Sequence, residues 1–444
     1  MVKSAYPQPL IQIISEQEFL PFVQETCREF FRVYNLLKTL VREEADFTKK
    51  FYAHLFQNAE ILETFLDEHG ARDNRTWFFF SEAVASIRNL GMAAFFIQHL
   101  LDRYPLYNLI EPDPNKERFY ADARGTLEFL NQSILNLFRA AVKTGQENGL
   151  ILPADSISLD EFREIQSNKQ LPKNVSEEQV KDEDERVIDL CEKISKAAEL
   201  MGKACIGQTD DLVQLKKLNR ETINEKSSRM FNNLIHSVQS EFDTYIKNTQ
   251  MMHKHEYLKH LRDYAVLSLH LQEVVLWLSH FYERHEDDIR QGECRAQISN
   301  LVDKAELLKK IINFAFYYSN VYIREGANLC EKILPAILKT VRYEVPIPQP
   351  HGFHARPSTY ISLIARKHET DVFLILDEEK YNVKSVMSLL QAGGMIADKG
   401  DQTVIFEGDK RALDDIRILA SHNYCEDSDL PPQLNYLRDL RTPA

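Results

Sequence analysis

The residues that most clearly suggest a chemical function are His354 and Arg356. They lie in a segment that reads His351-Gly352-Phe353-His354-Ala355-Arg356-Pro357-Ser358. Pro357 suits the first turn of a helix, where no amide donor is needed. A histidine just before a helix faces unpaired amides and the positive end of the helix dipole, and both favour an anion. Arg356 adds a planar guanidinium that matches phosphate oxygens, and a neutral imidazole is a nucleophile towards phosphorus. The segment predicts a phosphate site at His354; the simpler alternative is a histidine that only caps the helix.

The elements that must position this segment belong to a small α+β region. From residue 341 on, Tyr343, Val345 and Ile347 alternate with polar or proline positions, which predicts an edge strand. The pattern that follows predicts a helix over 355–368, strands over 371–376 and 380–383, a short helix from Ser385, a strand over 403–406 and a helix over 409–422 with Asp409 as its N-cap. This order predicts a sheet with helices on one face.

The region resembles HPr, the histidine-containing phosphocarrier protein of the bacterial phosphoenolpyruvate-dependent phosphotransferase system. The Gly-x-His-Ala-Arg-Pro core stands intact as Gly352 to Pro357. The segment Asn382-Val383-Lys384-Ser385-Val386-Met387, whose Ser385 lies thirty-one residues after His354, is similar to the family's segment around its regulatory serine. The resemblance covers roughly residues 341–425, about a fifth of the chain. It implies a small open-faced α+β sandwich.

By this resemblance His354 is the phosphoacceptor, through ring Nδ1, and Arg356 stabilises the phosphoryl group. Met387 and Leu390 lie on the partner-docking patch, and Ser385 is the regulatory serine that an HPr kinase modifies in many members. The partners that the resemblance implies are an enzyme I-like phosphoryl donor, a downstream phosphoacceptor protein and an HPr kinase. No cofactor is implied.

The sequence departs from the family in two places. Ser358 stands where the family usually has a small apolar residue, and the segment 391–400 is about four residues longer than the family's loop. Two alternatives therefore stay open. Ser385 can be a helix N-cap and nothing more, and the HPr-like domain can be a degenerate one that only docks partners, as part of a scaffold.

The composition and the apolar pattern of residues 1–340 predict helices. Glycine is scarce, and no proline occurs between Pro172 and Pro335, as long helices require. A capping box at Ser15 and apolar stripes at helical spacing predict helices up to about 41 and over about 47–69, 75–104 and 115–148. We expect a helical bundle over 1–149, a linker over 150–186 with an acidic run, a second helical bundle over 187–340, the HPr-like domain over 341–425 and a polar tail or docking strap over 426–444.

Composition and charge argue against several classes of function. The formal net charge of −13 argues against a general nucleic-acid binder. No apolar run reaches the roughly 18 residues of a membrane span, and we expect no membrane insertion. Six widely spaced cysteines without a CxxC pair are typical of reduced thiols. Together with this composition, the resemblance to HPr implies a cytoplasmic bacterial regulatory protein, a phosphoryl carrier more than an independent enzyme, whose helical region interacts with effectors or self-associates.

Two further motifs in the helical region are weaker. His253, Glu256 and His260 could share one helix face as metal ligands, but the Glu-x-x-His unit of di-iron bundles is absent from the sequence. We expect no metal, and a metal-binding helical bundle under HPr control is kept as an alternative. The segment Gly202 to Thr209 is similar to a P-loop, but Gln208 replaces the essential lysine, so we expect no nucleotide there.

Overall fold

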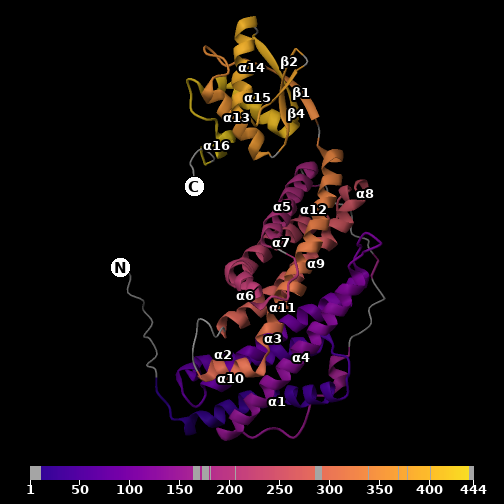
Figure 1. Ribbon diagram of the computed structural model, residues 1–444, viewed down its shortest axis with the longest axis vertical. Helices are drawn as coiled ribbons and strands as arrows, with labels where there is room; N and C mark the ends of the chain where they lie inside the picture. The colour runs from indigo at the N-terminus through magenta and orange to yellow at the C-terminus, as the bar shows by residue number, and fades with distance from the viewer. Residues whose placement is uncertain are drawn as a thin grey trace. The chain divides into compact units, whose positions relative to one another are not determined.

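The computed structural model describes residues 12–163, 171–172, 180, 182–205, 207–285, 293–338, 340–368, 370–377, 379–400 and 402–439. The chain divides into two compact units, Met1–Ile333 and Leu334–Ala444. The first unit is helical, and the second contains the sheet (Figure 1).

The helical unit begins with four long helices: α1 (Glu16–Arg42), α2 (Lys49–Glu68), α3 (Phe78–Arg103) and α4 (Lys116–Glu147). The Ser15 capping box is present, with the Glu18 amide donating to the Ser15 hydroxyl and the Glu18 carboxylate accepting from the Ser15 amide. Helix α3 contacts both α2 and α4, and α1 contacts the same two helices (Figure 1). The predicted helices are confirmed to within about three residues.

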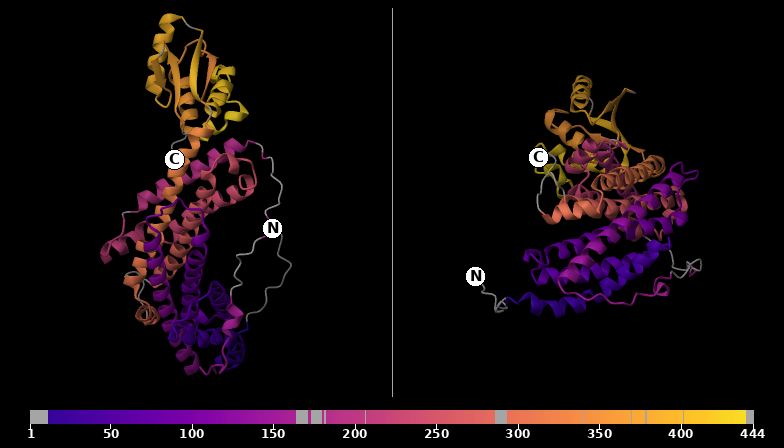
Figure 2. Two further views of the ribbon diagram at one scale, coloured as in Figure 1. Left: turned by 90° about the vertical axis from the view of Figure 1, so that its right-hand side faces the viewer. Right: turned by 60° about the horizontal axis from the view of Figure 1, so that its bottom comes forward.

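The rest of the unit contains eight helices in the described part of the chain and one π-helical stretch, Lys310–Phe316. The helices are α5 (Glu183–Ala204), α6 (Leu212–Glu221), α7 (Glu225–Tyr245), α8 (Met251–Lys254), α9 (Tyr257–Arg284), α10 (Glu293–Leu301), α11 (Lys304–Lys309) and α12 (Tyr317–Ile337). Helix α9 packs against α3 as well as against α7 (Figure 2). The two expected bundles thus share one compact unit, and the division of this region into two bundles stays a prediction.

The first part of the expected linker is fixed along α1. The Gln24 side chain exchanges two hydrogen bonds with the backbone of Ile151, at 2.8 and 2.7 Å. The Asn35 amide donates to the carbonyl of Pro153 at 2.9 Å. Residues 150–163 therefore form an ordered strap on the helices.

The acidic run of the linker divides at the start of α5. Glu183, Asp184 and Glu185 occupy the first turn of this helix, where the helix dipole stabilises negative charge. Glu177 and Glu178 lie outside the described residues.

One helical stretch, Phe78–Leu106, is long and apolar enough to cross a membrane by length and composition. Of its most apolar window, 56% is buried inside the helical unit. Because α3 contacts α2, α4 and α9, its apolar surface forms the core of that unit.

The second unit is a four-stranded antiparallel sheet with helices. Its elements are β1 (Thr340–Pro346), α13 (Ala355–Lys367), β2 (Val372–Leu376), β3 (Glu379–Asn382), α14 (Val386–Lys399), β4 (Thr403–Asp409) and α15 (Lys410–Ser421). The strand order is β1-β4-β2-β3. The element order, the edge position of β1 and the N-cap at Asp409 agree with the sequence-based predictions.

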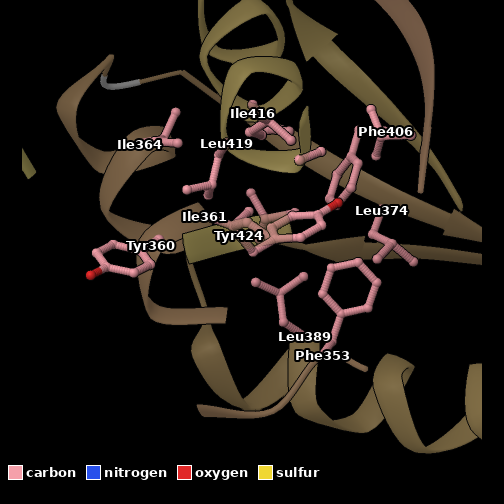
Figure 3. Close-up of a cluster of buried hydrophobic side chains, with 14 of the residues drawn as sticks. Phe353, Tyr360, Ile361, Ile364, Leu374, Leu389, Phe406, Ile416, Leu419 and Tyr424 are labelled. Carbon is pink, nitrogen blue, oxygen red and sulfur yellow. The ribbon is translucent and has the colours of Figure 1, made fainter. Parts of the chain in front are cut away.

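The core of this unit lies between the inner face of the sheet and the helices. Leu374 and Phe406 from the strands meet Ile361 and Ile416 from the helices, and all four are fully buried. Tyr424 lies in the middle of this cluster (Figure 3). The alternating burial of β2 and β4 leaves the residues of the opposite sheet face partly or fully exposed, which is the open-faced α+β arrangement that the resemblance implies.

The structure differs from the prediction in α14. The short helix expected from Ser385 continues for 14 residues to Lys399 and ends at Gly400, whose φ of +73° gives a left-handed C-cap. The segment expected as a longer loop is therefore helix. Inside this helix, position 393 requires a glycine because α14 approaches the backbone of Phe353. A Cβ at Gly393 would lie 2.8 Å from the Phe353 carbonyl oxygen.

The segment expected as a polar tail packs onto the same unit. It forms a 3-10 turn, Pro432–Leu434, and the short helix α16 (Tyr436–Asp439). Leu434 and Leu437 are fully buried in the core cluster, so two apolar side chains in a polar segment fix it to the fold. Residues 440–444 lie outside the described residues.

Candidate functional site

His354 is the N-cap of α13. Its backbone is extended, with φ −89° and ψ −171°, and its ring Nδ1 faces the backbone N–H of Arg356 at 3.5 Å. Its side chain is 37% exposed. Nδ1 therefore lies at the N-terminal end of a helix, where unpaired amides and the helix dipole favour an anion.

The neighbouring phenylalanine anchors the loop that carries His354. Phe353 is buried, with its ring edge-on to those of Phe406 and Tyr424 at centroid distances of 6.2 and 5.7 Å (Figure 3). Gly352, at φ +63°, lies in the left-handed region that favours glycine. The turn at Gly352 thus lets Phe353 point into the core while His354 stays accessible.

Two parts of Glu426 complete the surroundings of His354 and Arg356. Carboxylate Oε1 of Glu426 lies 2.9 Å from His354 Nε2, an ion-pair contact, and the Glu426 side chain is only 9% exposed. Its backbone carbonyl accepts a hydrogen bond from the Arg356 guanidinium at 3.1 Å. The sequence places Glu426 in the expected C-terminal tail and contains no signal for a role at this site.

An unusual turn presents Glu426 to the site. Asn423, Tyr424 and Cys425 all have positive φ, at 48°, 53° and 60°, a conformation that non-glycine residues rarely adopt in succession. The buried Tyr424 donates its hydroxyl hydrogen bond to the Pro346 carbonyl at 2.8 Å. The Asn423 side chain pairs with the backbone of Gln349 at 2.8 and 2.7 Å. These contacts hold the turn in place.

Ser385 is the N-cap of α14, and its hydroxyl accepts from the Ser388 amide at 3.2 Å. The preceding carbonyl, of Lys384, accepts from Ser362 at 2.8 Å and from Arg366 at 3.1 Å, both on α13. Since Ser362 lies eight residues beyond His354, the serine turn meets α13 roughly 12 Å along the helix from the histidine.

The two residues expected on a docking patch lie on the same helix. The Met387 side chain is 73% exposed, and Leu390 is partly buried. An exposed methionine is a flexible apolar contact that suits a protein partner. Their role as docking residues stays a prediction.

The histidines considered as metal ligands lie on separate elements. His253 is in α8, Glu256 precedes α9 and His260 is in α9, so the common helix face that the metal-binding alternative requires is not formed by these residues. The His260 ring hydrogen-bonds to the Asn108 carbonyl at 2.5 Å. Among the described residues, no three His, Cys, Asp or Glu side chains are grouped so that they could hold a metal ion.

A polar cavity of about 360 Å³ lies in the helical unit, beside the π-helical stretch. Gln208 and Thr209 of the P-loop-like segment line it together with three cations. Each cation is paired with a carboxylate of the same wall, as Lys309–Asp210 and Lys310–Glu306 at 2.8 Å and Arg118–Asp122 at 3.8 Å. The Gln208 amide donates to the Asn313 carbonyl at 2.8 Å. These polar side chains therefore bind one another within the cavity wall.

Comparison with known proteins assigns a family to the C-terminal unit. Residues 341–421 match the family model described as PTS HPr component phosphorylation site. No curated protein and no solved structure matches the chain. The C-terminal unit of this chain is therefore HPr-like in both sequence and fold, by a match that leaves residues 1–340 uncovered.

Proposed function

We propose that the C-terminal unit accepts a phosphoryl group on His354 from an enzyme I-like donor, and passes it to a downstream protein or holds it as a signal. The observation that carries this proposal is the position of His354 Nδ1, which faces the first amides of α13 with Arg356 in the first turn. Phosphoryl groups bind at such helix ends because the amides and the dipole stabilise negative charge.

The transfer step uses groups of this chain on one side and the donor's phosphohistidine on the other. The lone pair of His354 Nδ1 forms the new N–P bond, and the donor's N–P bond breaks with its electron pair returning to the donor's ring nitrogen. The amides of α13 and the Arg356 guanidinium stabilise the phosphoryl oxygens as the charge moves. The partner protein completes the site, so a deep substrate pocket is not required.

Ser385 is proposed as a second phosphorylation site, for an HPr kinase, that regulates the first. Direct repulsion between the two sites is weak, because roughly 12 Å of α13 separates them and charge interactions are screened over about 8 Å at physiological salt. A phosphate on Ser385 would instead lie beside Met387, where it disturbs an apolar docking surface and repels an acidic partner. The alternative is that Ser385 only caps α14.

The helical unit is proposed as an effector or interaction region that can self-associate, in a regulatory protein of the bacterial cytoplasm. Its long amphipathic helices support recognition of helical partners. The HPr match supports this setting, because HPr domains serve the phosphotransferase system.

The test is to incubate the full chain with phosphoenolpyruvate, enzyme I and its standard phosphocarrier, and to map acid-labile phosphate. We expect labelling at His354 that His354→Ala abolishes. His351→Ala is the matched control, because this ring lies on the same loop, 6.0 Å from His354 between centroids, and its loss should leave labelling intact. A folded wild-type chain that takes no label would favour the binding-only scaffold, and label that persists in His354→Ala would refute the assignment.

A further inference from the structure

We propose that Glu426 is a positioning residue for His354, whose carboxylate keeps the imidazole proton on Nε2 and so leaves Nδ1 as the nucleophile. The proposal rests on phosphoryl transfer to His354 and adds a residue that lies outside the family match, which ends at residue 421. Nothing in the motif around His354 supplies this carboxylate.

Both nitrogens of the ring favour the same tautomer. At Nδ1 the neighbour is the Arg356 N–H, a donor, which requires a lone pair on Nδ1. At Nε2 the neighbour is Oε1 of the Glu426 carboxylate, 2.9 Å away in an ion-pair contact, and the negative charge of this group favours a proton on Nε2. Nε2 and Oε1 are both buried, and neither makes a hydrogen bond within the described part of the chain, so their contact at 2.9 Å is an ion-pair contact. The surroundings therefore select the form that attacks phosphorus through Nδ1.

The carboxylate is held in place before any phosphoryl group arrives. The left-handed turn Asn423–Cys425 leads directly into Glu426, and the Arg356 guanidinium binds the Glu426 carbonyl. A buried carboxylate is costly unless a polar or cationic group faces it, and His354 is that group. The contact is therefore preorganised, as positioning requires.

The carboxylate also helps the chemical step. When Nδ1 bonds to phosphorus while Nε2 keeps its proton, the ring acquires positive charge, and Glu426 lies 2.9 Å from that ring nitrogen. The same carboxylate repels the incoming phosphoryl oxygens, but these lie beyond the opposite nitrogen. Since charge interactions weaken with distance, the attraction to the ring is the stronger effect.

The domain contains a matched control pair. His368, the C-cap of α13, has its Nε2 2.9 Å from Oδ2 of Asp415. The two histidines thus lie at opposite ends of one helix, each with a carboxylate at the same distance. Asp415→Asn should alter the ring of His368 and leave that of His354 unchanged.

The experiment measures the ring tautomer of His354 in the full, unphosphorylated chain from imidazole ¹⁵N chemical shifts at pH 8, with the signal assigned by its loss in His354→Ala. We expect the Nε2–H form to dominate in the wild type and in Asp415→Asn. In Glu426→Gln and Glu426→Ala the fraction of the Nδ1–H form should rise at least several-fold. Amide exchange in α13 verifies that each variant is folded.

The second measurement is the rate of single-turnover labelling from phosphorylated enzyme I and its phosphocarrier. Glu426→Gln should slow transfer roughly ten-fold, the usual size of an effect through an orienting partner, at an unchanged half-saturating donor concentration. Glu426→Asp should restore part of the rate. An unchanged tautomer ratio in both Glu426→Gln and Glu426→Ala would overturn the inference. A wild type that takes no label would instead overturn the proposed function, while the tautomer measurement, which needs no donor, would still decide the role of Glu426.

Discussion

Two adjacent glycines in α14 offer a direct test of how the His354 loop is supported. A Cβ added to Gly393 would lie 2.8 Å from the carbonyl oxygen and 3.0 Å from the Cβ of Phe353, whereas a Cβ on Gly394 would meet nothing within 4 Å. Both residues lie in the interior of the same helix. Gly394→Ala is therefore a matched control for Gly393→Ala.

The magnitudes follow from two opposing effects. Alanine stabilises a helix interior by about 1 kcal/mol relative to glycine, so Gly394→Ala should stabilise the C-terminal unit by about that amount. Gly393→Ala gains the same helix propensity but must displace the Phe353 backbone, and overpacking of this kind costs about 1–3 kcal/mol. The two variants should therefore differ by about 1–3 kcal/mol, with Gly393→Ala the less stable.

The assay is native-state hydrogen exchange on the amides of β2 and β4 in the full chain, which reports the opening free energy of this unit alone. Labelling of His354 is measured beside it. Because Phe353 is bonded to His354, Gly393→Ala should also slow labelling, and Gly394→Ala should not. Equal exchange free energies in the two variants would show that the close approach of α14 does not support the loop.

The remaining predictions concern charge. Arg356→Ala should slow single-turnover labelling of His354 about ten- to a hundred-fold, since a charge-assisted hydrogen bond contributes about 1.5–3 kcal/mol, and Arg356→Lys should recover part of it. Ser385→Asp should label more slowly than Ser385→Ala in the same assay; equal rates would leave Ser385 as a cap only. Burial lowers the pKa of His270 to about 3 and that of His99 to about 4. The unfolded chain therefore takes up protons first, and exchange protection in α3 and α9 should fall as the pH drops from about 6.5 towards 4.

The sequence was sufficient for elements whose signals are local. The order of strands and helices after residue 340 follows from hydrophobic period, and the position of His354 before a helix follows from Pro357 and the motif. The helix caps at Ser15 and Asp409 were predicted from the types of neighbouring residues alone. Each of these features depends on a few consecutive residues, so the types of neighbouring residues are sufficient to predict it.

The missed features depend on contacts between distant segments. Gly393 and Gly394 lie in the segment 391–400, which the resemblance to HPr assigns to a loop, yet the close approach of Phe353 requires a glycine at position 393 inside α14. Glu426 was assigned to the tail because three non-glycine residues in left-handed conformation have no sequence signal. The buried ring of Tyr424, whose hydroxyl binds Pro346, and the contacts of Asn423 with Gln349 hold that turn. The hydrophobic periodicity of a sequence does not reveal contacts between segments that lie far apart in the chain.

Because Glu426 lies beside His354, the choice of the C-terminal domain boundary affects the chemistry of the histidine as well as the completeness of the fold. A gene fragment cut at residue 421, where the family match ends, would keep the histidine motif, all four strands and the last long helix. It would lose the carboxylate at His354 and the buried Leu434 and Leu437. A fragment made for expression or grafting should therefore extend to about residue 439. A shorter fragment would contain the whole histidine motif, but one side of His354 would face water.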